Sequence, residues 1–202
     1  MKKLVTASVF TFTALAATSQ VVVWSDDFSN PANWTIAHDG PVDLDWQIGV
    51  GLTNTGGFPT DPVQSTTSAN GYAMLDSDGA NNPGPYEESS FMTTAVPIDL
   101  SATPNAVLRF ESNFRNYPPT RCFVVVSTNN TDWPALNTNM GPMANVFPLF
   151  AAVGGNESTA NPQVAMLDIA SAIAGDPTQV WIRFHWTGLY GYSWFVDDVA
   201  VL

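Results

Sequence analysis

The chain has 202 residues, of which 18 are acidic and 6 are basic, so its formal net charge is −12. Charged residues make up 12%, about half the fraction of an ordinary soluble domain, while the hydrophobic fraction of 45% is normal and argues against disorder. This charge leaves no basic face for phosphates or anionic lipids, which disfavours nucleic acid and membrane-surface binding. The 7 Trp, 15 Pro and 14 Gly favour short strands joined by loops over a helical bundle.

The N-terminus has the pattern of a secretory signal peptide. Lys2 and Lys3 precede an apolar stretch over residues 4–17, and small residues follow at the two positions that signal peptidase reads. The stretch is too short to cross a hydrocarbon core of roughly 30 Å, which disfavours a membrane anchor. We therefore predict a signal peptide over residues 1–19 and a secreted or cell-surface bacterial domain over residues 20–202.

Strand-like segments recur along this domain and are separated by turn-rich stretches. We predict strands over residues 20–24, 71–75, 90–94, 106–114, 122–128, 179–186 and 193–202. Residues 164–174 differ, because their apolar spacing and the following Gly175 and Pro177 indicate a strand that runs into one or two helical turns. Without an internal repeat or linker, one domain fits best. The only cysteine, Cys122, lies in an apolar run and is predicted to be a buried thiol.

Two of these segments alternate between apolar and polar residues, as strands with one buried face do. Residues 106–115 place three apolar side chains on one side and four polar ones on the other: Leu108, Phe110 and Phe114 against Arg109, Glu111, Asn113 and Arg115. Residues 181–186 behave alike, with Arg183 and His185 on the polar side. The arginines can pair with Glu111 and other acids on a solvated sheet, or they can form the floor of a concave ligand groove.

An ordered set of short motifs carries a family resemblance. The motifs are Gly71-Tyr72-Ala73-Met74-Leu75-Asp76, Pro97-Ile98-Asp99-Leu100-Ser101, Val107-Leu108-Arg109-Phe110, Val124-Val125-Val126-Ser127-Thr128, Leu167-Asp168-Ile169, Val180-Trp181-Ile182-Arg183-Phe184 and Trp194-Phe195-Val196-Asp197-Asp198-Val199. Their order and spacing resemble the MAM-like jelly-roll modules, also called choice-of-anchor J domains, of secreted and surface-attached bacterial proteins. The resemblance implies an all-β jelly-roll (concanavalin/MAM-like) β-sandwich of two antiparallel sheets with one short helical turn.

The same resemblance implies a non-catalytic module of adhesins and carbohydrate-active proteins. The chain ends on its last predicted strand, without the sorting domain that usually follows such modules. We therefore expect either a minimal secreted protein or a piece of a longer surface protein with further domains.

Three acid pairs are candidates for an ion site. Related jelly-roll carbohydrate-binding modules often hold a structural calcium between their first and last strands, with an Asp of the terminal Asp-Asp-Val motif as a ligand. The resulting set of predicted calcium ligands is Asp27, Asp76, Asp78, Asp197 and Asp198. Adjacent strand residues point to opposite faces, so Asp197 and Asp198 can serve one ion only if a bulge re-aims one of them. The alternative is that these are ordinary turn aspartates that hydrogen-bond nearby backbone.

Aromatic residues gather near the C-terminus. Tyr190 and Tyr192 lie in or beside a glycine-containing turn, and Tyr86 follows a proline-rich loop. Aromatic rings suit the apolar C–H faces of sugars, so these three tyrosines and Arg115 are the predicted ligand-binding residues. The alternative for Tyr190 and Tyr192 is that they fill the end of the core, which is the interpretation that we favour for Trp186 and Trp194.

The motifs of common hydrolases are absent from the sequence. A glycosidase needs only two carboxylates, but the spacing of the acids singles out no pair. We therefore predict no enzyme, but a binding or adhesion module for an extracellular glycan or a cell-surface protein. The alternatives are a secreted carboxylate-dependent glycoside hydrolase and a spacer domain of a larger surface protein.

Overall fold

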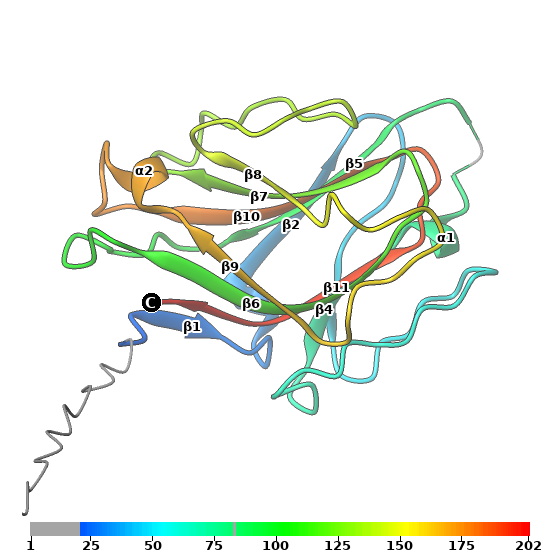
Figure 1. Cartoon of the computed structure of the whole chain (residues 1–202), viewed down its shortest axis with the longest axis horizontal. Coiled ribbons are helices and arrows are strands. Elements are labelled where there is room, and N and C mark those ends of the chain that lie inside the picture. The colour runs from blue at the N-terminus through cyan, green and yellow to red at the C-terminus, as the bar shows by residue number, and fades with distance from the viewer. Residues whose placement is uncertain (1–20, 83) are drawn as a thin grey trace, which may run out of the picture.

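A computed structural model describes residues 21–82 and 84–202, so the predicted signal peptide and its cleavage site lie outside the described residues. Two antiparallel sheets pack face to face in it (Figure 1). The predicted all-β sandwich is thus confirmed. In the described ranges, no helix is long and apolar enough to cross a membrane.

Each sheet is built from strands that are far apart in the sequence. Sheet A has the strand order β3 (Gln47–Gly49), β4 (Tyr72–Asp76), β11 (Ser193–Val201), β6 (Val107–Arg115) and β9 (Gln163–Asp168), and β1 (Trp24–Asp26) also pairs with β11. Sheet B has the order β2 (Trp34–Asp39), β5 (Glu88–Thr94), β10 (Trp181–Gly188), β7 (Thr120–Ser127) and β8 (Val146–Leu149). The chain therefore crosses repeatedly between the two sheets.

Short helical turns join some of these strands. The predicted passage from strand to helix is confirmed, because β9 leads into α2 (Ala170–Ile173). Two further turns were not predicted, the 3-10 helix η1 (Pro31–Asn33) and α1 (Ser77–Ala80). The carboxylate of Asp76 starts α1 by accepting a hydrogen bond from the backbone N–H of Gly79 at 2.9 Å.

Six of the seven predicted strands overlap the observed ones along most of their length. The first is wrong in position, because the strand β1 begins only at Trp24. Val21, Val22 and Val23 are exposed, so no sheet face buries their side chains. Three short strands, β2, β3 and β8, were not predicted from the sequence.

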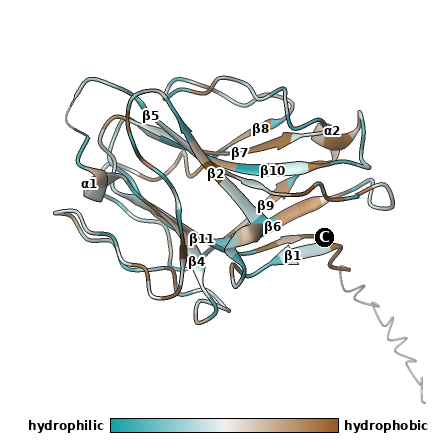
Figure 2. Cartoon of the chain, turned by 180° about the vertical axis from the view of Figure 1, so that it is seen from behind, coloured by the Kyte–Doolittle hydropathy of each residue, from teal (hydrophilic) through white to brown (hydrophobic). Residues whose placement is uncertain are grey.

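The core lies between the sheets and is rich in aromatic rings. Trp186 and Trp194 are fully buried, which confirms their predicted place in the core. Each indole N–H has a buried acceptor: Trp194 donates to Ser112 Oγ at 2.9 Å and Trp186 to Glu88 Oε2 at 2.8 Å. Hydrophobic residues are concentrated along β7 (Figure 2).

Cys122 belongs to this core, as predicted. Its side chain is buried among the apolar residues between the sheets, and burial raises the pKa of the thiol well above its ordinary value. The thiol therefore behaves as a small hydrophobic group.

The predicted division of β6 into two faces is confirmed on the core side only. Leu108, Phe110 and Phe114 lie in the core. The prediction that the opposite face is solvated was wrong, because Glu111 and Asn113 are also buried. On sheet B, Arg183 and His185 are buried in the same way. Both outer faces are covered by irregular segments, residues 50–70 over sheet A and residues 128–145 over sheet B.

Candidate functional site

Residues 50–70 form an irregular segment, here called the strap, that lies across the outer face of sheet A. The strap contains no helix or strand. An extended segment on a sheet face must find partners for its backbone N–H groups. Most of the partners are acidic side chains of sheet A and α1, and these acids include three of the predicted calcium ligands, Asp76, Asp78 and Asp198.

Asp76 and Asp78 hold the N-terminal half of the strap. Asp76 Oδ2 accepts hydrogen bonds from the backbone N–H of Thr55 at 2.6 Å and from its hydroxyl at 3.0 Å. Asp78 Oδ2 accepts from the backbone N–H of Phe58 at 2.6 Å. Both aspartates are buried. Gly56 of the strap lies directly against Asp78. Only glycine fits there, because a Cβ would lie 1.9 Å from Asp78 Oδ2.

Glu111 holds the C-terminal half of the strap. It accepts a hydrogen bond from the backbone N–H of Thr66 at 2.9 Å, and it forms an ion pair with Arg109 at 2.7 Å. Burial raises the pKa of Glu111, but the hydrogen bonds from Arg109 and Thr66 outweigh burial, and the net pKa lies below its ordinary value. The predicted pairing of an arginine with Glu111 is therefore confirmed for Arg109.

Asp197 and Asp198 also bind the strap, and a bulge makes this possible. The register between β11 and β6 shifts between Asp197 and Ala200, and Asp198 has a φ of 49°. Asp197 accepts a hydrogen bond from the Ser65 hydroxyl, and Asp198 accepts one from the backbone N–H of Thr67 at 3.1 Å. Burial raises the pKa of Asp197 to about 7.

Asp27 lies where the strap returns to β4. Its carboxylate accepts hydrogen bonds from Asn70 at 2.8 Å and from the Ser29 hydroxyl at 2.6 Å, which lower its pKa. Asp27 and Asp198 line the same pocket of about 480 Å³, together with Asp26, Asn33, Thr67 and Arg109. The five predicted ligands thus lie along the strap, and Asp27 and Asp198 face a common space.

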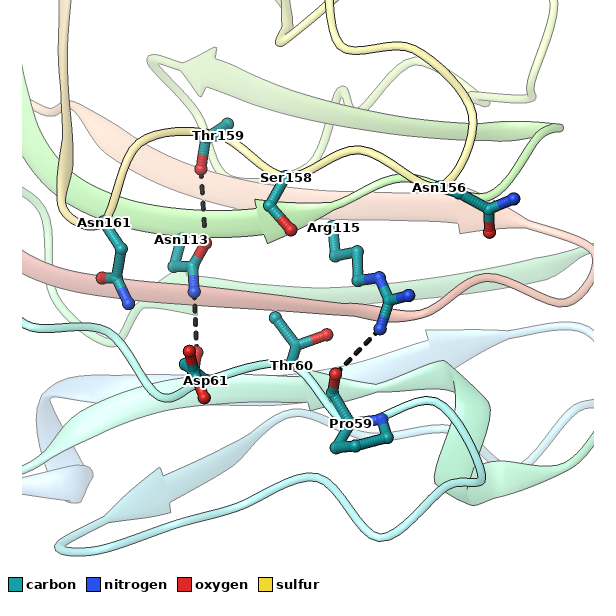
Figure 3. Close-up of a pocket in the computed structure, with 9 residues that line it drawn as sticks. All are labelled: Pro59, Thr60, Asp61, Asn113, Arg115, Asn156, Ser158, Thr159 and Asn161. Carbon is teal, nitrogen blue, oxygen red and sulfur yellow. Dashed lines mark hydrogen bonds between the residues drawn. The ribbon is translucent and has the colours of Figure 1, made fainter.

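A polar cleft of about 430 Å³ lies between the strap and residues 154–162, with the end of β6 as its floor (Figure 3). Its lining residues are Pro59, Thr60, Asp61, Asn113, Arg115, Asn156, Ser158, Thr159 and Asn161. Most of them carry an amide or a hydroxyl group. Asp61 is the one carboxylic acid among them.

Arg115 and Asn113 fix the strap wall of the cleft from the floor (Figure 3). Arg115 Nη1 donates hydrogen bonds to the carbonyl oxygens of Pro59 at 2.8 Å and Phe58 at 3.3 Å. Asn113 donates its amide to the carbonyl oxygen of Asp61 at 2.7 Å. The prediction of an acidic partner was wrong for Arg115. Its other guanidinium N–H groups make no hydrogen bond within the described part of the chain.

The opposite wall is tied directly to the strap. Asn161 donates its amide to the carbonyl oxygen of Pro62 at 2.9 Å and accepts from the backbone N–H of Gln64 at 2.8 Å. Thr159 donates its hydroxyl to Asn113 Oδ1 at 3.4 Å. Three segments that are distant in sequence are therefore held as one polar surface.

An aromatic cluster supports Arg115 beside the cleft. The guanidinium carbon of Arg115 lies 4.3 Å from the centre of the Tyr192 ring, and the rings of Phe58 and Tyr117 each lie 5.3 Å from it. Tyr192 is only 4% exposed and donates its hydroxyl to Asn156 Oδ1. The structure thus brings the predicted pair Arg115 and Tyr192 together, with Tyr192 as a buried support rather than an open platform.

The rings that reach solvent in this cluster are Phe58 and Tyr117, at 51% and 42% exposure. Sequence reasoning missed both, although each lies next to a proline in a turn-rich stretch between predicted strands, where a large apolar side chain has few core neighbours to bury it. The amides of the cleft were missed as well, because single Asn and Thr residues in loops give no periodic signal.

Tyr86 and Tyr190 lie together at a different place. The side chain of Asn82 donates hydrogen bonds to the carbonyl oxygens of Tyr86 and Leu189, both at 2.8 Å. Tyr86 is 57% exposed and Tyr190 is 38% exposed. Neither residue lines the Arg115 cleft. They form a second exposed aromatic surface, and their predicted role in ligand binding stays a prediction.

One further group of metal-ligating side chains was not predicted. Among the described residues, His38, Asp43 and Asp45 bring one ligand atom each within 4.8 Å of one another. His38 Nδ1 and Asp45 Oδ1 lie 2.9 Å apart, and this hydrogen bond raises the pKa of the histidine. The five predicted calcium ligands do not belong to this group.

Comparisons with known proteins support the fold. No protein-family model and no curated protein sequence match the chain. It is similar to the K1 cleaved adhesin domain of Lys-gingipain from Porphyromonas gingivalis W83, at 17% identity and a TM-score of 0.53, over 89% of this chain and 96% of that one. The K2 adhesin domain of Lys-gingipain matches at 12% identity and a TM-score of 0.50, over 89% and 97%. TmCBM27, a mannan-recognising carbohydrate-binding module, matches at 14% identity and a TM-score of 0.43, over 90% of this chain and 96% of that one.

Proposed function

We propose that this chain is a non-catalytic binding module, secreted or held at the bacterial cell surface, which recognises a glycan in the Arg115 cleft. The observation that carries the proposal is the chemistry of the cleft. Its amides, hydroxyls and free guanidinium N–H groups can donate and accept hydrogen bonds, as sugar hydroxyls require. The exposed rings of Phe58 and Tyr117, which contact Tyr192 beside the cleft, can stack on the C–H face of a sugar.

A glycan fits this surface better than a protein partner does. Protein interfaces bury a broad surface with an apolar centre. The cleft has a volume of about 430 Å³ and is lined mainly by polar groups, which suits a chain of sugar units. A cell-surface protein is the second ligand class for the same module.

The lining of the cleft argues against a glycoside hydrolase. Such an enzyme needs two carboxylates on opposite sides of the bond that is cleaved. Asp61 is the one acid of the lining, and the acid with a pKa near neutrality, Asp197, is fully buried beneath the strap. We therefore place the chain among binding modules.

The fold is compatible with this role. The K1 and K2 adhesin domains of Lys-gingipain share the sandwich fold, and we extend the adhesion role to this chain as a proposal. Membership of the MAM-like, or choice-of-anchor J, family is part of the same proposal, and it rests on the ordered sequence motifs.

A structural calcium ion is a further part of the proposal. Its site would be the pocket shared by Asp27 and Asp198, where carboxylates, the Thr67 hydroxyl and the Asn33 amide supply the oxygen ligands that calcium prefers. A calcium titration of the mature domain, followed by its melting temperature, tests this part. An increase in melting temperature that Asp198→Asn abolishes supports it, and a melting temperature unmoved by calcium and by chelator contradicts it.

Binding of the mature domain to a glycan array tests the main proposal. We expect one or more glycans to bind the wild type and to be lost with Arg115→Gln and Tyr117→Ala. Arg121→Gln is the matched control, because it removes the same charge from an exposed arginine on β7, away from the cleft.

The alternatives give different outcomes. Loss of binding with Tyr86→Ala and Tyr190→Ala, but not with the cleft variants, would move the site to the second aromatic surface. An array without any bound glycan would favour a surface-protein ligand or a spacer role.

A further inference from the structure

The outer face of sheet B carries a row of polar side chains that crosses three strands. Thr35 of β2 pairs with Thr93 of β5, and Thr93 pairs with Arg183 of β10. Residues directly opposite one another in a sheet point to the same face. The row therefore places two hydroxyls and one guanidinium side by side on the face that residues 128–145 cover.

Arg183 is held rigidly in this row. Its guanidinium carbon lies 3.9 Å from the centre of the Phe91 ring and 3.7 Å from the centre of the Trp133 ring, so the guanidinium lies between the two rings. Nε donates a hydrogen bond to the Thr93 hydroxyl at 2.9 Å. Arg183 is only 9% exposed, so its orientation is fixed by its surroundings.

The charge of Arg183 has no acidic partner in direct contact. Within residues 21–82 and 84–202, the ion pairs are those of His38 with Asp45 and of Arg109 with Glu111. The prediction that Arg183 pairs with an acid was therefore wrong. Its Nη1 and Nη2 groups make no hydrogen bond within the same ranges.

Arg183 is charged at neutral pH, whereas the neighbouring His185 is not. Burial lowers the pKa of Arg183 to about 10, which leaves the guanidinium charged at neutral pH. Burial and the neighbouring Arg183 lower the pKa of His185 to about 3, so that imidazole is neutral. Buried charges are normally paired, but no carboxylate touches Arg183, and the charge of Asp39 acts on it only from further away; an anion bound at the Nη groups would complete the pairing.

A small pocket opens at this arginine. It has a volume of about 90 Å³. Its lining residues are Thr35, Phe91, Thr93, Thr94, Ala95, Asn130 and Arg183. Roughly 10–15 Å³ of such volume holds one water molecule, so the pocket has room for a carboxylate group. The amide of Asn130 and the hydroxyl of Thr35 add donors beside the guanidinium.

We propose that the Arg183 pocket binds a single carboxylate group, carried by an acidic sugar such as a uronic acid or by a free small carboxylate. A carboxylate matches the planar fork of a guanidinium, which can give it two parallel hydrogen bonds. The net charge of −12 opposes the approach of a polyanion, so the ligand has one isolated acidic group. The site lies on sheet B and does not depend on the Arg115 cleft of sheet A.

Titration of the mature domain with glucuronate, acetate and glucose tests the proposal, with the side-chain Nε–Hε signal of Arg183 in an NMR spectrum as the readout. We expect glucuronate and acetate to shift this signal at low salt and glucose to leave it unchanged. Tighter binding of glucuronate than of acetate identifies the acidic sugar as the source, and equal binding identifies the carboxylate alone.

Variants separate binding from folding. Arg183→Gln should weaken binding at least about tenfold, because it removes the charged fork. Arg121→Gln removes the same charge from the same sheet face and should leave binding unchanged. Asn130→Gly removes an exposed amide, fits the left-handed backbone there (φ of 55°), and should weaken binding several-fold even if Arg183→Gln fails to fold. An Arg183 signal that no carboxylate shifts, or binding that Asn130→Gly and Arg183→Gln leave intact, would overturn the proposal.

Discussion

The outer faces of both sheets are covered by irregular segments, but the two covers are held by different forces. The strap over sheet A is held by carboxylates that accept hydrogen bonds from its backbone, as Asp76 and Glu111 do. The cover of sheet B packs apolar side chains on the sheet, namely Trp133, Leu136 and Met140 on Phe123, Val125 and Val146. The strap also packs Val63 and Leu52 on Tyr72, Met74 and Phe195, so it depends on carboxylates as well as on apolar contacts, whereas the cover of sheet B depends mainly on buried apolar area.

This difference changes how the role of the acid pairs on sheet A and α1 is interpreted. In the sequence they look like metal ligands, and in the structure most of them are hydrogen-bond acceptors for one irregular segment. A carboxylate that accepts backbone hydrogen bonds stabilises the strap without any ion. The strap in turn forms one wall of the Arg115 cleft, so the acids support the proposed binding site from below.

Among changes in the two covers, Asp76→Ala is expected to lower the free energy of unfolding most. It removes the acceptor of three hydrogen bonds in a buried place, and we expect the free energy of unfolding to fall by about 3 kcal/mol. Urea denaturation measures it. Asp61→Ala is the control on the same strap, because Asp61 is exposed, and it should change stability by less than about 0.5 kcal/mol. Equal losses in both variants would contradict the role of Asp76.

Glu111→Gln tests whether charge holds the strap. Glu111 has a lowered pKa in the folded chain, so its stabilising charge is fully present above its ordinary pKa of 4.5 and is lost as pH falls through the lowered value. We expect a loss of about 2 kcal/mol at pH 7 and a smaller loss at pH 3, below the ordinary pKa of the group. Denaturation at the two pH values measures this, and a loss that is independent of pH would contradict it.

Leu136→Ala is the matching change in the cover of sheet B. Leu136 is half-buried, and we expect a loss of about 1.5 kcal/mol, which is less than for a fully buried leucine. Because no charge is involved, the loss should be the same at pH 4 and pH 7. A clear dependence on pH would show that the two covers are held in the same way.

Asp197→Asn is expected to have the smallest effect, with the opposite sign. Burial raises the pKa of Asp197 from 3.8 to about 7, so the folded chain loses stability as pH rises through this range. Asparagine stays neutral, and we expect a gain of the order of 1 kcal/mol at pH 8 and none at pH 3.5. Melting curves in a chelator measure it, so that no bound cation offsets the buried charge. A loss of stability at pH 8 would contradict it.

The sandwich could be predicted because the alternation of apolar and polar residues along a strand is visible within a few neighbouring residues of the sequence. Leu108 and Phe110 face the core as their spacing indicates, and the aromatic strands of sheet B behave alike. The strands β3 and β8 could not be predicted, because they are too short to show a period and are fixed by their neighbours. The burial of Glu111 could not be predicted either, since its partner Thr66 lies 45 residues away.

The candidate site could be predicted only in part. Arg115 and Tyr192 were both predicted, and the structure brings them together. Their orientation was not evident, because the ring of Tyr192 is buried by Phe58 and Tyr117 from other loops. A bulge was stated as the condition for Asp197 and Asp198 to serve one ion; the structure contains the bulge, and the ion itself stays a prediction.

Hydrogen exchange of the mature domain, with and without a glycan that binds on the array, tests the central claim most directly. Our account predicts slower exchange in residues 58–61 of the strap and in residues 154–161, which form the two walls of the Arg115 cleft. Protection confined to residues 81–86 and 189–190, around Tyr86 and Tyr190, would contradict it.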